Sequence, residues 1–173
     1  MVTPATDWTK AWTASAYEPD PVTAATCGGG ALASFGGYLC WGTMHVPLMS
    51  TLPHFSVYSG DAPADTQRVV TWARNSERSI SIFRGRNFAT SPALDVVYGY
   101  AQIPAYVKTG PTPGSWQTKP NGMSPPLWGT AGFGNPFNNY TWTMSVYDNR
   151  PEEGAGRQPD PPPTEDGRRR LPQ

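Results

Sequence analysis

Proline and glycine recur along the whole of this chain, and this leaves little room for long helices. The sequence contains 20 prolines and 18 glycines among 173 residues. Proline breaks a helical hydrogen bond and clashes with the preceding turn, while glycine is costly to order. Aromatic residues still make up 12% of the sequence, which argues against a disordered chain. The composition therefore favours a small, mainly β domain over a helical bundle.

The overall charge excludes several classes of partner. Thirteen Lys and Arg residues balance thirteen Asp and Glu residues, so no global field attracts nucleic acid or an anionic membrane. No window approaches the roughly 18 apolar residues of a membrane span. We therefore expect no nucleic-acid binding and no membrane span. The start, residues 1–7, lacks the basic and apolar parts of a secretory signal, which predicts a cytoplasmic location if the start is genuine.

The clearest β signal lies around Gly36 and Gly37. A paired glycine suits the positive φ angles of a two-residue hairpin, so we expect a strand ending at Phe35 and a second strand over Tyr38–Val46. Alternation divides the second strand into two faces. One face carries Tyr38, Cys40, Gly42, Met44 and Val46, and the other carries Leu39, Trp41, Thr43 and His45. Because both faces are bulky, this strand is expected inside a sheet.

One amphipathic helix is expected at 62–75. Asp61 or Asp65 can cap its start, and an apolar stripe recurs at helical spacing. The stripe consists of Thr66, Val69, Val70 and Ala73, with Trp72 beside it.

Shorter patterns predict the remaining elements. We expect strands at 55–58, 79–83 and 94–100, a turn at 84–87, and a loop system with short strands over 101–139. Gly28–Gly30 is interpreted as a flexible connection and residues 1–26 as an irregular N-terminal segment.

A last strand is expected at 140–147, where polar and apolar residues alternate before the turn signal Asp148-Asn149. The partner strand that should follow is missing from the pattern. Residues 151–173 are rich in Pro, Arg and Gly and hold almost no apolar side chain, so they are predicted to be a disordered tail. The β-rich domain is accordingly placed at 27–150.

Two internal echoes suggest a repeat. Residues 32–39 and 144–151 each read as a strand, an aromatic residue and a two-residue turn, and Trp41-Gly42-Thr43 matches Trp128-Gly129-Thr130. Residues 38–43 also follow the form aromatic-Leu-aromatic-aromatic-Gly-Thr, except that Cys40 stands at its third position. In this the chain resembles the kelch-like β-propellers of bacterial surface and secreted proteins.

The resemblance implies antiparallel hairpins arranged as propeller blades. A propeller needs at least about four blades of roughly 40 to 50 residues, and this chain has material for fewer. The resemblance therefore implies an incomplete propeller: a fragment, an oligomer or an open β-structure. If the chain is a fragment of an exported protein, its location is secreted or at the cell surface.

Candidate binding residues come from the arginines and tryptophans. Two guanidinium groups and an amide at Arg84, Arg86 and Asn87 can hold a carboxylate, a phosphate or sugar hydroxyls, or can simply cover nearby rings at a surface turn. Tryptophan can stack on a sugar ring or a peptide, although in strands it more often lies in the core. The predicted binding residues are Trp41, His45, Arg84, Arg86, Asn87, Trp128 and Trp142.

The sequence gives little support for a metal site or for a reactive cysteine. Cys27, Cys40, His45 and His54 contain no closely spaced ligand pair, so we predict no metal site and no cofactor. His45 is expected on the exposed face of its strand, opposite Cys40, which prevents a nucleophile–base pair. Two reduced thiols are favoured over a disulfide.

The sequence thus predicts a non-catalytic binding or interaction module, a truncated β-propeller with no assignable ligand, for which a carbohydrate or a protein is a candidate partner. Two alternatives stay open. One is a carbohydrate-acting hydrolase or lyase in which His45, Arg84 and Arg86 converge; the other is a gene fragment without function.

Overall fold

The computed structural model of this chain describes residues 10–62, 64–147 and 150–153. The fold is mainly β with antiparallel sheets, as the sequence predicts. Among the described residues no helix has the length and hydrophobicity to cross a membrane. The helices are η1 (Ala14–Ala16), α1 (Pro21–Thr26), α2 (Thr51–Val57), α3 (Thr66–Ser76) and η2 (Ala131–Gly134). The strands are β1 (Gly28–Phe35), β2 (Tyr38–Met44), β3 (Ile82–Arg86), β4 (Ala93–Tyr98), β5 (Gln102–Val107), β6 (Ser115–Pro120), β7 (Met144–Tyr147) and β8 (Arg150–Glu153).

The largest sheet has the order β1-β2-β3-β4, with each strand antiparallel to the next. Its first turn contains Gly36 and Gly37 with φ angles of 57° and 78°, which glycine adopts without steric cost. Phe35 pairs with Tyr38 across this turn. The predicted hairpin and the interior position of β2 are therefore confirmed. β5 pairs with β6 and β7 pairs with β8 in two further hairpins.

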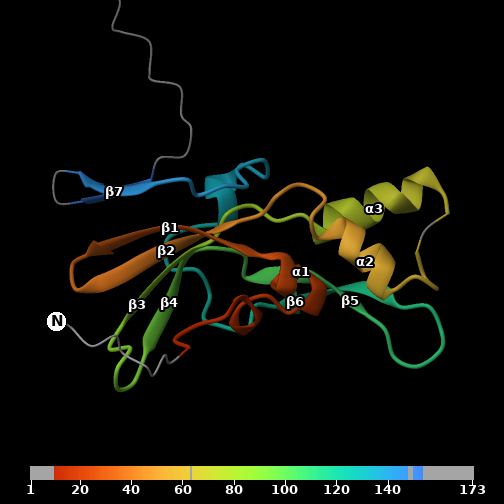
Figure 1. The fold of residues 1–173 in the computed structure, drawn as a ribbon, viewed down its shortest axis with the longest axis horizontal. Helices are drawn as coiled ribbons and strands as arrows, with labels where there is room; N and C mark the ends of the chain where they lie inside the picture. Colours follow the sequence, from red (N-terminus) through yellow and green to blue (C-terminus); the bar gives the residue numbers. More distant parts are fainter. Residues whose placement is uncertain (1–9, 63, 148–149, 154–173) are drawn as a thin grey trace, which may run out of the picture.

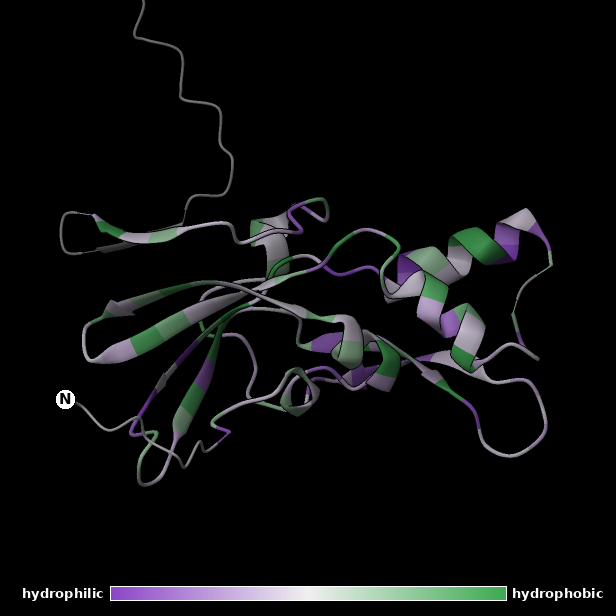
Figure 2. Cartoon of the chain, viewed as in Figure 1, coloured by the Kyte–Doolittle hydropathy of each residue, from purple (hydrophilic) through white to green (hydrophobic). Residues whose placement is uncertain are grey.

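The inner face of the β1–β4 sheet forms the main core. Phe83 is completely buried, and its ring lies 4.9 Å from that of Trp12, 5.0 Å from that of Tyr17 and 5.7 Å from that of Trp41. Val96 and Ile103 complete this cluster. Hydrophobic and hydrophilic residues are mixed along β3 and β4 (Figure 2), as expected for strands whose two faces differ.

The outer face of the same sheet is covered over only part of its area. Ile80, Ile82 and Val97 are buried there, with Met144 packed against them. Next to this cluster, Thr141 lies over Gly30 and Gly42, where a Cβ atom on either glycine would collide with it. The hairpin β7–β8 runs alongside β1 (Figure 1). The absence of side chains at these glycines thus allows the chain before β7 to contact the sheet.

The predicted helix is confirmed as α3, with Asp65 as its N-cap. The Asp65 carboxylate accepts a hydrogen bond from the Arg68 amide at 2.8 Å. Its buried side chains are Trp72 and Ser76, whereas Val70, assigned to the apolar stripe, is 37% exposed. Trp72 was placed beside the stripe and in fact anchors the helix, because its ring packs on Phe55, His54 and Tyr106.

Four predictions made from short patterns are wrong. Residues 21–26 form α1, because Asp20 accepts from the Thr23 amide at 2.8 Å and Pro21 suits the first turn. Gly28–Gly30 open β1 and are no flexible connection. Residues 55–58, predicted as a strand, fall on α2 and its C-terminal end. Residues 84–86, predicted as a turn, belong to β3, since Arg84 and Gly85 pair with both β2 and β4 and Arg86 pairs with β4.

The C-terminal predictions hold only in part. The strand predicted at 140–147 begins at Met144, and Tyr140 makes just one bridge, to Met44. A partner strand does follow, because β8 pairs with β7 over residues 150–153; the prediction that this partner is missing is wrong. Residues 1–9, the Asp148-Asn149 turn and the remainder of the predicted tail, 154–173, lie outside the described residues.

Candidate ligand-binding site

The open part of the outer sheet face carries two arginines. Arg84 on β3 pairs with Cys40 on β2 and with Asp95 on β4, and directly opposed residues share a face. Tyr38 and Arg86, each two residues along its strand, therefore lie on the same face. We name Tyr38, Arg84, Arg86, Asp95 and Trp128 the arginine–aromatic surface.

Cation–π stacking and an ion pair hold the side chains of this surface in place. The Arg84 Nε donates to Asp95 Oδ2 at 2.8 Å. The guanidinium carbon of Arg84 lies 4.5 Å from the Tyr38 ring centroid and 5.7 Å from that of Trp128, and Arg86 lies 5.0 Å from Tyr38. Each exposed cation–π contact contributes about 0.5–1 kcal/mol. The contacts run from Trp128 through Arg84 and Tyr38 to Arg86, so the surface is held in shape before any ligand arrives.

Trp128 comes from a loop that is fastened to the edge of β4. The amides of Leu127 and Trp128 donate to Val96 and Val97 at 2.9 and 3.0 Å, and Gly129 forms a parallel bridge with Tyr98. The indole is nevertheless 60% exposed. A fixed backbone with an open ring makes Trp128 a platform on which a ligand can stack.

Three of the seven predicted binding residues meet at this surface: Arg84, Arg86 and Trp128. Asn87 is exposed in the following turn with a φ of 59°. Trp142 stacks on Tyr140 at 5.2 Å and is 66% exposed. Trp41 is buried in the inner core, which is the alternative that the sequence left open for tryptophan in a strand.

Two members of the surface were missed. Tyr38 was already assigned to the Cys40 face by alternation, but its value as a stacking partner appears only once β3 lies beside β2. Asp95 sits in a correctly predicted strand, yet pairing with Arg84 depends on the register between two strands. Alternation could have assigned Arg84 and Asp95 each to a face of its strand. That the two residues lie directly opposite each other depends on the register, which one sequence does not reveal.

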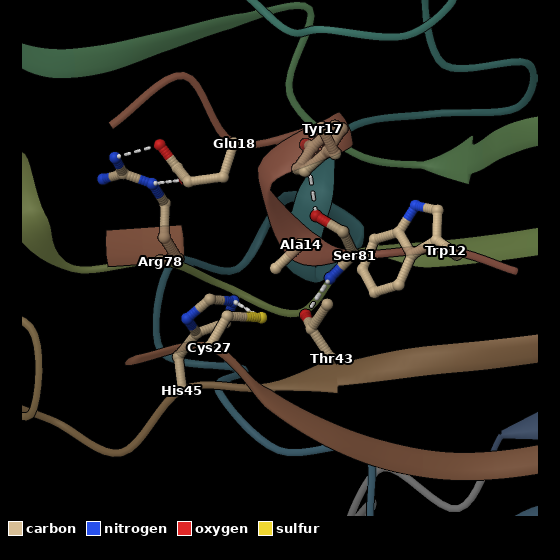
Figure 3. Close-up of a pocket in the computed structure, with 9 residues that line it drawn as sticks. All are labelled: Trp12, Ala14, Tyr17, Glu18, Cys27, Thr43, His45, Arg78 and Ser81. Carbon is tan, nitrogen blue, oxygen red and sulfur yellow. Dashed lines mark hydrogen bonds and ion pairs between the residues drawn. The ribbon is translucent and has the colours of Figure 1, made fainter. Parts of the chain in front are cut away.

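His45 lies elsewhere, and its predicted exposure is wrong. It is only 8% exposed because its amide donates to Asn139 at 2.8 Å beyond the end of β2 and its ring lines an internal pocket. Figure 3 shows His45 facing Cys27, with Nε2 3.7 Å from the thiol sulfur. The buried Glu18–Arg78 ion pair, at 2.7 Å, lines the same pocket. Among the cysteines, sequence reasoning weighed only Cys40 as a nucleophile for His45, rejected that pair, and did not consider Cys27 as the neighbour of His45.

The Cys27–His45 pair is not an activated nucleophile. Burial raises the pKa of the Cys27 thiol to about 12, and burial together with Arg78 lowers the pKa of His45 to about 4. Both groups are therefore neutral near pH 7, whereas a reactive cysteine needs its thiolate. Both described cysteines are free, in agreement with the prediction of reduced thiols. His45 shares the inner face with Trp41, so it does not converge with Arg84 and Arg86 on the outer face.

A second buried polar cluster joins the helices to β5. His54 Nε2 lies 2.9 Å from Asp20 Oδ1, and the other Asp20 oxygen accepts from the Tyr106 amide at 2.8 Å. Burial alone would raise the pKa of Asp20, but the bonds from His54, Thr23 and Tyr106 lower it to about 2. Because Asp20 and His54 are both fully enclosed, this cluster fastens elements together and offers no surface to a ligand.

Within the described residues, no three His, Cys, Asp or Glu side chains gather in a way that could hold a metal ion. Comparison of the chain with protein-family models, with curated proteins and with solved structures gives no match. The site must therefore be interpreted from its own geometry.

Proposed function

We propose that this chain is a non-catalytic carbohydrate-binding module whose ligand lies on the arginine–aromatic surface. The observation that carries the proposal is the gathering of Arg84, Arg86 and Trp128 with Tyr38 on an open sheet face. The alternative of a hydrolase or lyase needs His45 at the same place, and His45 is enclosed in the pocket with Cys27.

The chemistry of the surface suits a polyhydroxylated ring. The exposed face of Trp128 can stack on the C–H groups of a sugar. Arg84 offers N–H donors and Asp95 offers carboxylate acceptors to hydroxyl groups. Because Arg84 is already stacked and paired with Asp95, little side-chain entropy is lost on binding.

We extend the proposal to the architecture: the chain is part of an incomplete β-propeller. The β1–β4 sheet supports this, since an antiparallel meander of four strands is the unit of a propeller blade. In the hairpins β1–β2 and β7–β8 the last residue of the first strand pairs with the first residue of the second, Phe35 with Tyr38 and Tyr147 with Arg150. In this interpretation β7 and β8 are two strands of a neighbouring blade.

A fluorescence titration tests the binding function. Neutral and acidic oligosaccharides are added while the tryptophan emission of the wild type, Trp128→Ala and Trp142→Ala is recorded. Trp142 is a matched control because it is 66% exposed against 60% for Trp128 and stacks away from the surface on Tyr140. Loss of one stacked ring, worth about 0.5–1.5 kcal/mol, should weaken binding about twofold to tenfold in Trp128→Ala alone.

Equal loss of affinity in both variants would contradict the proposed surface. If no saccharide changes the emission of the wild type, the binding function itself fails. The interpretation as a gene fragment without function would then be favoured.

A further inference from the structure

We infer that the ligand is an acidic carbohydrate, a sugar chain carrying carboxylates, and that Arg86 is the residue that selects it. This inference rests on the proposed function and adds the chemical class of the ligand. The argument comes from the difference between two arginines that lie two residues apart on one face of β3.

The two arginines differ in their partners. Arg84 faces Asp95 on β4 and donates to its carboxylate at 2.8 Å. Arg86 faces Ala93 in the same strand pair, and among the described residues no acidic side chain forms an ion pair with it. Arg84 is therefore charge-compensated by Asp95, while within the described part of the chain Arg86 presents an uncompensated positive charge.

Arg86 is also oriented for recognition. It is exposed, and its guanidinium carbon lies 5.0 Å from the Tyr38 ring centroid. Stacking against a ring restrains the guanidinium plane and leaves its N–H edge free. A planar fork of donors matches both oxygens of one carboxylate, giving two parallel charge-assisted hydrogen bonds.

The net charge of the surface indicates what kind of anion fits. Arg84, Arg86 and Asp95 together leave one positive charge, and the Asp95 carboxylate would repel a doubly charged phosphate. A carboxylate carries a single charge and is planar, so it complements Arg86 better. A uronic acid combines this group with a ring that can stack on Trp128, at the other end of the same run of contacts.

The test compares two ligands with the same sugar rings, one charged and one neutral. Trigalacturonate and its methyl ester share the same rings, but the ester has lost the carboxylates. Each is titrated into the wild type, into Arg86→Gln and into Arg68→Gln, a control on α3 whose side chain is 60% exposed. We expect the wild type and Arg68→Gln to bind the acid about tenfold or more tightly than the ester, a preference that weakens with salt. Arg86→Gln should bind both ligands equally.

A second readout locates the ligand. Cys40 pairs with Arg84 on the same face, while Cys27 lines the internal pocket. Bound trigalacturonate should slow alkylation of Cys40 and leave that of Cys27 unchanged, as measured by mass spectrometry of the modified peptides.

The possible failures are distinguishable. If acid and ester bind the wild type equally and binding still depends on Trp128, the inference is overturned and the proposed function stands. If Arg86→Gln keeps the preference for the acid, Arg86 is not the selecting residue. If inorganic phosphate competes as strongly as trigalacturonate, the surface is a general anion site and not a site for sugar acids. If neither saccharide binds, the proposed function falls as well.

Discussion

The two faces of the β1–β4 sheet are made by alternate residues of the same strands, yet they have different roles. On the inner face Phe83 is fully enclosed by aromatic rings. Its neighbour Arg84 points to the outer face, where its side chain stays 25% exposed and pairs with Asp95. β3 therefore supplies a buried aromatic residue on one side and, in our proposal, the recognition surface on the other, so that stability and binding should be separable by mutation.

The largest effect is expected at the inner face. Phe83→Ala removes a buried ring and leaves a cavity, which should lower the free energy of unfolding by about 3–5 kcal/mol. Arg84→Ala is the matched control on the next residue, with an expected loss below about 1 kcal/mol. Urea denaturation measures both. Equal losses would mean that the two faces do not divide the roles as described.

The second largest effect is expected from acid, which should lower the free energy of unfolding through a buried histidine on the inner side of the sheet. The pKa of His45 is lowered from 6.5 to about 4 by burial and by Arg78, so the unfolded chain binds a proton that the folded chain refuses. The contribution of neutral His45 to the free energy of unfolding is fully present above about pH 6.5. This free energy should fall by about 3 kcal/mol as the pH drops to 4. His45→Gln keeps a neutral polar side chain and should flatten this part of the pH profile of unfolding. An unchanged slope in the variant would assign the pH dependence to another group.

Substitutions at two glycines of the β1–β2 hairpin distinguish the covered part of the outer face from the open part. A Cβ atom on Gly42 would collide with the Thr141 side chain, whereas a Cβ atom on Gly29 meets nothing within 4 Å. Gly42→Ala should therefore cost about 1–3 kcal/mol through overpacking, and Gly29→Ala should be nearly neutral. Thermal denaturation of the two variants measures the difference. Similar melting temperatures would show that Thr141 does not pack tightly on the sheet.

The smallest effect is expected for the ion pair on the open part. The side chains of Arg84 and Asp95 are 25% and 34% exposed, so solvent screens their attraction. A double-mutant cycle with Arg84→Ala and Asp95→Ala should give a coupling free energy of about 0.2–1 kcal/mol. A coupling of several kcal/mol would show that the pair serves stability rather than the ordering of a binding surface.

Sequence reasoning succeeded where the signal is local. The Gly36-Gly37 hairpin, the α3 helix with its Asp65 cap and the two-faced strand β2 each depend on residues close in the chain. It failed where distant partners decide. Gly85 and Asn87 favour a turn at residues 84–87, but pairing of Arg84 and Gly85 with both β2 and β4, and of Arg86 with β4, places residues 84–86 in β3.

The candidate site shows the same division. Arg84, Arg86 and Trp128 were recognised by residue type, because few side chains offer planar donors or large exposed rings. Their meeting with Tyr38 and Asp95 required the register of three strands and a loop held on β4. His45 was misplaced because the end of a strand gives no sign of which segment will cover it.

Alternation along β2 and β3 was enough to assign each residue to one side of a sheet, since a strand turns successive side chains to opposite sides whatever surrounds it. Which side becomes the core, and how much of the other stays open, was decided by chain segments far away in the sequence. Trp12 and Tyr17 close the inner side, and Thr141 closes the part of the outer side over Gly30 and Gly42. Burial depends on what packs against a surface, and that is a property of the assembled fold.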